Sequence, residues 1–144
     1  MRRSLVVPAV CAALILGPAI RANEKPTEAY QNAMKELDAA SQILRHHARM
    51  VEPGGDCCYE WVEKDAATMK AAFATVLEFW TAKKTADAIS LARDGMNDAA
   101  NLEKAAKAKH YDGVVAAEGA VLQGCEPCHE RHRKKMPDGS FEIN

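Results

Sequence analysis

Apolar residues recur at alternating spacings of four and three along this chain, and no other feature constrains its fold as much. That spacing keeps apolar side chains on one face of an α-helix. The first stripe follows Pro26 and Thr27 and covers about six helical turns. It consists of Tyr30, Met34, Leu37, Ser41, Leu44, Ala48 and Val51. A turn at 53–56 ends this helix, and we expect Asp56 to cap the next one.

Two further stripes with the same spacing follow. The second consists of Val62, Ala66, Met69, Phe73, Val76 and Trp80. The third consists of Ile89, Ala92, Met96, Ala99, Leu102 and Ala106. The segment 81–85 between them is polar but contains neither Gly nor Pro, so the sequence marks this helix boundary only weakly. Gly95 lowers the helix propensity of the third segment locally.

A fourth, shorter helix is predicted after 107–111, with Asp112 as its N-cap. Its apolar face consists of Val114, Ala117 and Val121. The same spacing then leads to Cys125 and Cys128. The tail at 134–144 is mostly polar and contains one Pro and one Gly, and we expect it to be loosely ordered.

These four segments predict an all-α protein that folds as an antiparallel four-helix bundle, with short loops between its helices. The composition agrees, because 48% of the residues are hydrophobic but only 6% are aromatic. Much of the apolar fraction is Ala, which favours closely packed helices over a β-sandwich. A length of 144 residues indicates one domain. The pattern alone leaves other packings of four helices open.

The N-terminus, residues 1–22, is predicted to be a signal peptide that exports the chain to the periplasm. A pair of arginines precedes an apolar run at 5–20, and Ala22 offers a small residue for cleavage. A membrane anchor is the alternative, but the run is short and contains two prolines. The mature domain would then be residues 23–144.

Cleavage at this point removes three arginines and no acidic residue, so the formal charge changes from −1 to −4. A mildly acidic protein displaces few counterions from a phosphate backbone, which argues against nucleic-acid binding. No second apolar stretch is long enough to span a bilayer, and we therefore expect no stable membrane insertion after cleavage.

Near the C-terminus lies Cys125-x-x-Cys128-His129, the most specific motif of the chain. Two thiols at this spacing can each add to one vinyl group of a haem, and the adjacent His can bind the iron. The motif therefore predicts one covalently bound haem c, with His129 as an iron ligand. Pro127 removes a helical N–H, so we expect a kink or a restart of the last helix at this point.

Two other chemistries fit the motif less well. A thioredoxin-like dithiol needs a βαβ context and a helix N-terminus, and no strand pattern precedes the first cysteine. A zinc site would use Cys125, Cys128, His129 and His132. A small exported bundle does not need such a metal for its stability.

The remaining cysteines of the mature chain, Cys57 and Cys58, are adjacent. A disulfide between neighbours would be strained, and the pair has no C-x-x-C spacing. We interpret them as unpaired thiols that pack as small side chains at the start of the second helix.

The last helix resembles that of the class II c-type cytochromes, the group of cytochrome c′ and cytochrome c-556. In that group the last helix ends in Cys-x-x-Cys-His, and an Arg follows four residues after the His, before further basic residues. Arg133 occupies this position here, followed by Lys134 and Lys135. Tyr30 is similar to the Tyr near the start of the family's first helix. The likeness in architecture covers most of the mature chain, but in sequence it is specific only for the last helix.

The resemblance implies a periplasmic single-haem protein that is not an enzyme. It would be an electron carrier that meets redox partner proteins or, alternatively, a five-coordinate binder of nitric oxide or carbon monoxide. The sixth iron site decides between these functions, and Met34 is the candidate metal ligand there. Arg133 would lie beside His129, where its charge tunes the haem. A homodimer formed through outer helix faces is also implied.

The first helix departs from the family's pattern in two positions. The family has Arg directly after the Tyr, whereas this chain has Gln31. The family's sixth-site residue lies about five positions after the Tyr, where this chain has Lys35 with Met34 beside it. His46 and His47 leave a distal histidine ligand open, although the arginines around them favour a surface position.

Overall fold

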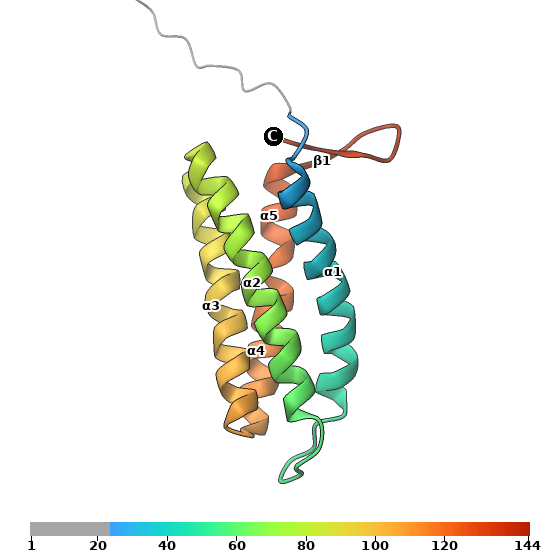
Figure 1. The fold of residues 1–144 in the computed structure, drawn as a ribbon, viewed down its shortest axis with the longest axis vertical. Helices are drawn as coiled ribbons and strands as arrows, with labels where there is room; N and C mark the ends of the chain where they lie inside the picture. The colour runs from blue at the N-terminus through green and yellow to red at the C-terminus, as the bar shows by residue number, and fades with distance from the viewer. Residues whose placement is uncertain (1–23) are drawn as a thin grey trace, which may run out of the picture.

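The computed structural model describes residues 24–144 and confirms the all-α antiparallel bundle (Figure 1). Its helices are α1 (Glu28–Arg49), α2 (Tyr59–Lys83), α3 (Ala86–Lys107), α4 (Tyr111–Gln123) and α5 (Cys125–His132). Because only Gly124 separates α4 from α5, these two together form the fourth helix of the bundle. The chain ends in the antiparallel strands β1 (Arg133–Lys135) and β2 (Phe141–Ile143). The predicted signal peptide, residues 1–22, lies outside the described residues.

The helix α1 begins as expected, because the Thr27 hydroxyl accepts a hydrogen bond from the Tyr30 N–H at 3.3 Å. Its buried face consists of Tyr30, Ala33, Leu37, Ala40, Leu44 and Ala48. The predicted stripe was therefore wrong at two positions, since Met34 and Ser41 are only half-buried at its edge. Alanines at 33 and 40 are buried instead, and their small side chains suit the close packing of α1 on α2.

The predicted stripe of α2 is confirmed, since all six of its residues are buried. In α3 the buried residues are small except for Leu102, and one of them is Gly95, the residue that weakens the helix. A Cβ atom on Gly95 would lie 2.5 Å from Cε1 of Phe73, so the ring of Phe73 requires glycine at this point. Ile89 and Met96, expected at the centre of the α3 stripe, are only partly buried.

The helix boundaries differ from the predicted caps. Cys58, with φ 76°, is the N-cap of α2, and Asp56 lies two residues earlier, where its carboxylate accepts a hydrogen bond from Lys109 at 2.6 Å. Asp112 lies inside α4, because His110 is the N-cap. At the weakly marked boundary, Lys84 ends α2 in the left-handed conformation with φ 56°. Side-chain chemistry alone does not reveal these positive φ values.

The tail at 134–144 is a β-hairpin and not the loosely ordered segment that its polarity predicts. At its tip, Asp138 accepts a hydrogen bond from the Ser140 N–H at 2.9 Å, and Gly139 adopts φ 84°. Near its end, Ile143 is only 6% exposed and joins the core. The burial of one apolar side chain and the paired backbone groups hold the tail against the bundle.

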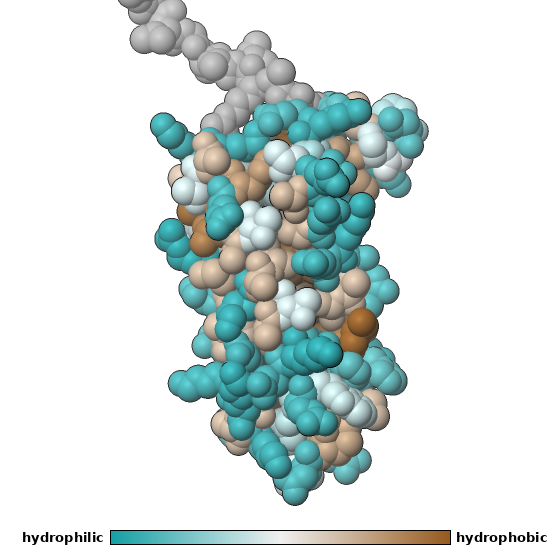
Figure 2. All heavy atoms as spheres, in the orientation of Figure 1, coloured by the Kyte–Doolittle hydropathy of each residue, from teal (hydrophilic) through white to brown (hydrophobic). Residues whose placement is uncertain are grey.

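The surface in Figure 2 mixes hydrophilic and hydrophobic residues without one continuous apolar area on the viewed face. The large apolar side chains that are exposed include Ile43, Met50, Trp61, Val115 and Phe141. Among the helices described here, none combines the length and the apolar character that a membrane span requires.

Candidate haem-attachment site

The motif lies on α5, which begins at Cys125 directly after Gly124. The expected restart of the last helix is confirmed, because α4 ends one residue before that glycine. Pro127 is then the third residue of α5, where a helix has no intrahelical partner for a backbone N–H. The break therefore lets proline stand within the motif without the loss of a helical hydrogen bond.

The two motif cysteines are free thiols and are half-buried. A spacing of three residues places Cys125 and Cys128 on neighbouring positions of one helix face. Burial raises the pKa of both thiols, and for Cys128, with a further contribution from Asp87, to about 11. Both are therefore protonated at neutral pH, with the S–H bond that addition to an alkene consumes.

His129 follows the second cysteine and is also half-buried. Burial lowers the pKa of its imidazole, and the nearby Arg133 lowers it further, while Asp38 has the opposite effect. The Arg133 Nη1 atom lies 3.4 Å from the His129 Nδ1 atom. A neutral imidazole keeps a nitrogen lone pair, which is what an iron ligand needs.

The helix α1 lies alongside the motif (Figure 1). Burial raises the pKa of Tyr30, and the neighbouring Cys128 raises it further. One turn and two turns later along α1 come Met34 and Asp38, and the charge of Asp38 acts on His129. Residues spaced by four share one helix face, so Met34 lies on α1 between two side chains that interact with the motif.

His132 is turned away from a shared metal site with the motif. Its Nε2 atom lies 3.0 Å from an Asp87 carboxylate oxygen of α3, and its ring packs on Trp80 of α2 with centroids 4.9 Å apart. Within residues 24–144, no group of three or more His, Cys, Asp or Glu side chains is arranged to hold a metal ion. His132 therefore fastens α5 to α2 and α3.

The two histidines of α1 lie elsewhere. His47 Nδ1 is 2.6 Å from an Asp65 oxygen of α2, and its ring is 5.2 Å from that of Trp61. These side chains line a groove of about 490 Å³ between α1 and α2. His46 is exposed. The pairing of His47 with Asp65 gives it a partner outside the motif.

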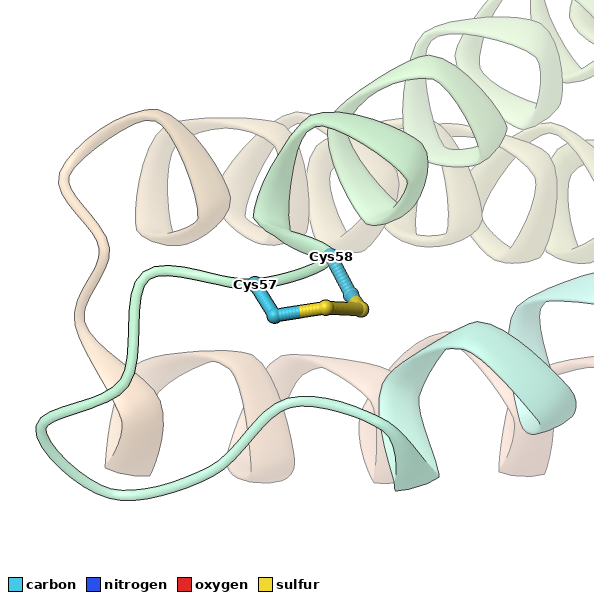
Figure 3. The surroundings of a disulfide bond; sticks show 2 residues. All are labelled: Cys57 and Cys58. Atoms are coloured by element: carbon cyan, nitrogen blue, oxygen red, sulfur yellow. A yellow bond between two sulfur atoms is a disulfide. The ribbon is translucent and has the colours of Figure 1, made fainter.

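Cys57 and Cys58 form a disulfide, which corrects the expectation of two unpaired thiols. Figure 3 shows the bond where the loop from α1 meets the first residue of α2. Cys57 is exposed and Cys58 is buried. Adjacency alone argued against this bond, whereas the left-handed conformation of Cys58 at the helix start accompanies it.

Sequence reasoning missed three features of the structure: the disulfide, the contact of His132 with Asp87, and the C-terminal hairpin. The first two depend on backbone conformation and on tertiary packing. The hairpin did have a local signal, because Pro137, Asp138 and Gly139 form a turn sequence between two short segments. The composition of the tail concealed it.

Comparisons with known proteins give a distant likeness. Neither a family model nor a curated protein matches the chain. Among solved structures, it is similar to the nitric oxide complex of the L16A mutant of cytochrome c prime from Alcaligenes xylosoxidans. The match has 21% identity and a TM-score of 0.46 over 77% of this chain and 100% of the other.

Proposed function

We propose that this chain is a single-haem c-type cytochrome, with the haem attached to Cys125 and Cys128 and its iron bound by His129. The observation that carries the proposal is the state of the motif: two free, half-buried thiols one turn apart on α5, next to a half-buried imidazole. Each S–H adds across one vinyl group, so two thioethers form and nothing leaves. Two thiols and an imidazole at this spacing are the donor set that covalent haem attachment uses.

When bound, the haem supplies an iron that exchanges one electron or takes up a diatomic gas. The residues of this chain decide which of these two functions the iron performs. His129 would bind the iron, and Cys125 and Cys128, half-buried on α5, would hold the haem. Met34 of α1 is our candidate for the sixth ligand, because it lies between Tyr30 and Asp38 on the face that interacts with the motif. With Met bound, the protein is an electron carrier.

A second function has its own support. Ala33 is buried in the α1 stripe, and Met34 lies at its edge. A methyl group at the buried position cannot bind iron, so this register favours an open sixth site. The protein would then bind nitric oxide or carbon monoxide on a five-coordinate iron.

The setting of either function follows from the same residues. We propose the periplasm as its location, on the signal peptide predicted for residues 1–22, and redox proteins as partners of the electron carrier. A homodimer would use the outer face of α1 and α2, where Ile43 and Trp61 are 48% and 42% exposed. Neither function requires a catalytic residue.

The test is the absorption spectrum of the protein produced together with haem-attachment machinery, reduced with and without carbon monoxide. A mass increase of one haem and a low-spin spectrum unmoved by the gas support the electron carrier. In that case Met34→Leu should give a high-spin, gas-sensitive spectrum, and Met69→Leu, in the core of α2, should not. A high-spin wild type that shifts with the gas supports the gas binder. Unmodified Cys125 and Cys128 would exclude both functions.

A further inference from the structure

The C-terminal hairpin is fastened to the end of the bundle that carries the motif (Figure 1). Glu24, ahead of α1, exchanges two backbone hydrogen bonds with Ile143: each N–H donates to the other's carbonyl, at 3.1 and 2.9 Å. The Asn144 N–H donates to the His132 carbonyl at 3.4 Å. The strand β2 is therefore held between the start of α1 and the end of α5.

This attachment fixes the position of Phe141 relative to Arg133. In the register of the hairpin, Arg133 of β1 is opposite Ile143 of β2, and Phe141 lies two residues before Ile143 on β2. Arg133 and Phe141 are thus diagonal neighbours on one face, within reach of a long side chain and a ring. The Arg133 Cζ atom lies 3.6 Å from the centroid of the Phe141 ring. A guanidinium stacked on a ring in this way is attracted by the π-electrons.

The same guanidinium lies against the imidazole of the motif. Its Nη1 atom is 3.4 Å from the His129 Nδ1 atom. Arg133 is otherwise exposed, and a free arginine side chain would sample many rotamers. The ring of Phe141 on one side restricts it to a conformation that keeps its charge beside His129 on the other.

We propose that Phe141 is a positioning residue for the iron site: it holds the charge of Arg133 beside His129 and thereby sets the reduction potential of the haem. The inference rests on the proposed haem attachment and deepens it. A positive charge beside an axial ligand stabilises the reduced iron, which carries one positive charge fewer. The held arginine therefore raises the midpoint potential.

Other charges near the site do not replace this one. Asp38 of α1 acts on His129 with the opposite sign. Lys134 and Lys135 share the strand of Arg133. Lys135 is directly opposite Phe141, but the guanidinium of Arg133 is the charge that stacks on the ring. Lys134 alternates to the other face of β1, so it adds a charge of the same sign without the stack. It is therefore the matched control for Arg133.

The experiment measures the midpoint potential of the holoprotein by redox titration. Arg133→Gln should lower the potential, and Phe141→Leu should lower it in the same direction, although it removes no charge. Phe141→Tyr keeps the ring and should restore the wild-type value. Lys134→Gln should change the potential less than Phe141→Leu does. In the Phe141→Leu/Arg133→Gln double variant, the potential should equal that of Arg133→Gln alone, since both changes act through one group.

A second readout separates positioning from loss of the hairpin. In wild-type protein the ring of Phe141 should shift the side-chain proton resonances of Arg133 upfield, and Phe141→Leu should abolish this shift. The backbone resonances of Glu24 and Asn144 should stay in place, which shows that the hairpin is intact. The inference would be overturned if Phe141→Leu and the wild type had the same midpoint potential. It would also be overturned if Lys134→Gln and Phe141→Leu changed the midpoint potential equally. A chain without covalent haem would overturn the proposed function itself, and the inference with it.

Discussion

The chain carries two pairs of cysteines at opposite ends of the bundle, and they are in different chemical states. Cys57 and Cys58 are adjacent in the loop before α2 and are joined by a disulfide (Figure 3). Cys125 and Cys128 are separated by one helical turn on α5 and are free thiols. The difference shows that the local backbone decides whether a pair of cysteines in this fold forms a disulfide.

Pairing of the neighbours also affects the motif. Among residues 24–144, Cys57 and Cys58 are the only cysteines outside the motif. Because they close on each other, they leave no thiol that could form a wrong disulfide with Cys125 or Cys128. In the periplasm that we propose for this chain, the loop pair would thus protect the motif pair during folding.

The largest effect should come from removal of one pair or the other. Cys125→Ser/Cys128→Ser should abolish covalent haem completely, because both thioether sulfurs are lost. Cys57→Ser/Cys58→Ser keeps the motif and should carry one haem per chain. The haem content is measured from the pyridine haemochrome spectrum and from the mass of the intact protein. Loss of covalent haem in the loop variant would contradict the separate roles of the two pairs.

The next effect concerns the reactivity of the motif thiols in haem-free protein. The pKa of Cys128 is raised, mainly by burial, to about 11 from its ordinary value of 9.0. A raised pKa favours the thiol over the thiolate, so alkylation near neutral pH should be roughly 100-fold slower than in unfolded chain. The rate should rise with pH and level off near pH 11 in the folded protein, but near pH 9 in denaturant.

This profile is measured with iodoacetamide, with peptide mapping to assign each labelled cysteine. Cys57 and Cys58 serve as the internal control, because a disulfide does not react until a reductant is added. If the rate for folded Cys128 levels off near pH 9, its burial in this structure is wrong.

The bundle and the motif were predictable from sequence because both depend on local spacing. The stripe of α2 is continuous from Val62 to Trp80, and burial follows that spacing directly. In α1 the same reasoning was wrong by one residue, since Ala33 and Met34 both fit a helical face. Packing against α2 decides between them, and one helix considered alone does not contain that information.

The remaining features depend on contacts distant in sequence. Asp56 has the chemistry of an N-cap, but Lys109 of the α3–α4 turn binds it. Ile143 pairs with Glu24 at the other end of the described chain, and this pairing orders a tail that is polar by composition. The resemblance to the family placed Arg133 beside His129, whereas nothing in the sequence placed the ring of Phe141 on its guanidinium.

The smallest effect should be on stability, and it addresses the loop pair alone. A disulfide between neighbours closes the shortest possible loop, so it restricts the unfolded chain little, and the chain-entropy relation gives about 1 kcal/mol. Cys58 also holds φ 76°, a costly conformation that serine can leave once the bond is gone. Cys57→Ser/Cys58→Ser should therefore lower the free energy of unfolding by at most about 1 kcal/mol. Urea unfolding followed by circular dichroism measures it, with Leu44→Ala, a fully buried position, expected to lose about 2–5 kcal/mol as the reference. If the disulfide variant loses as much free energy of unfolding as Leu44→Ala, the bond holds the start of α2 in place. The two cysteine pairs would then differ in their contribution to stability as well as in their chemistry.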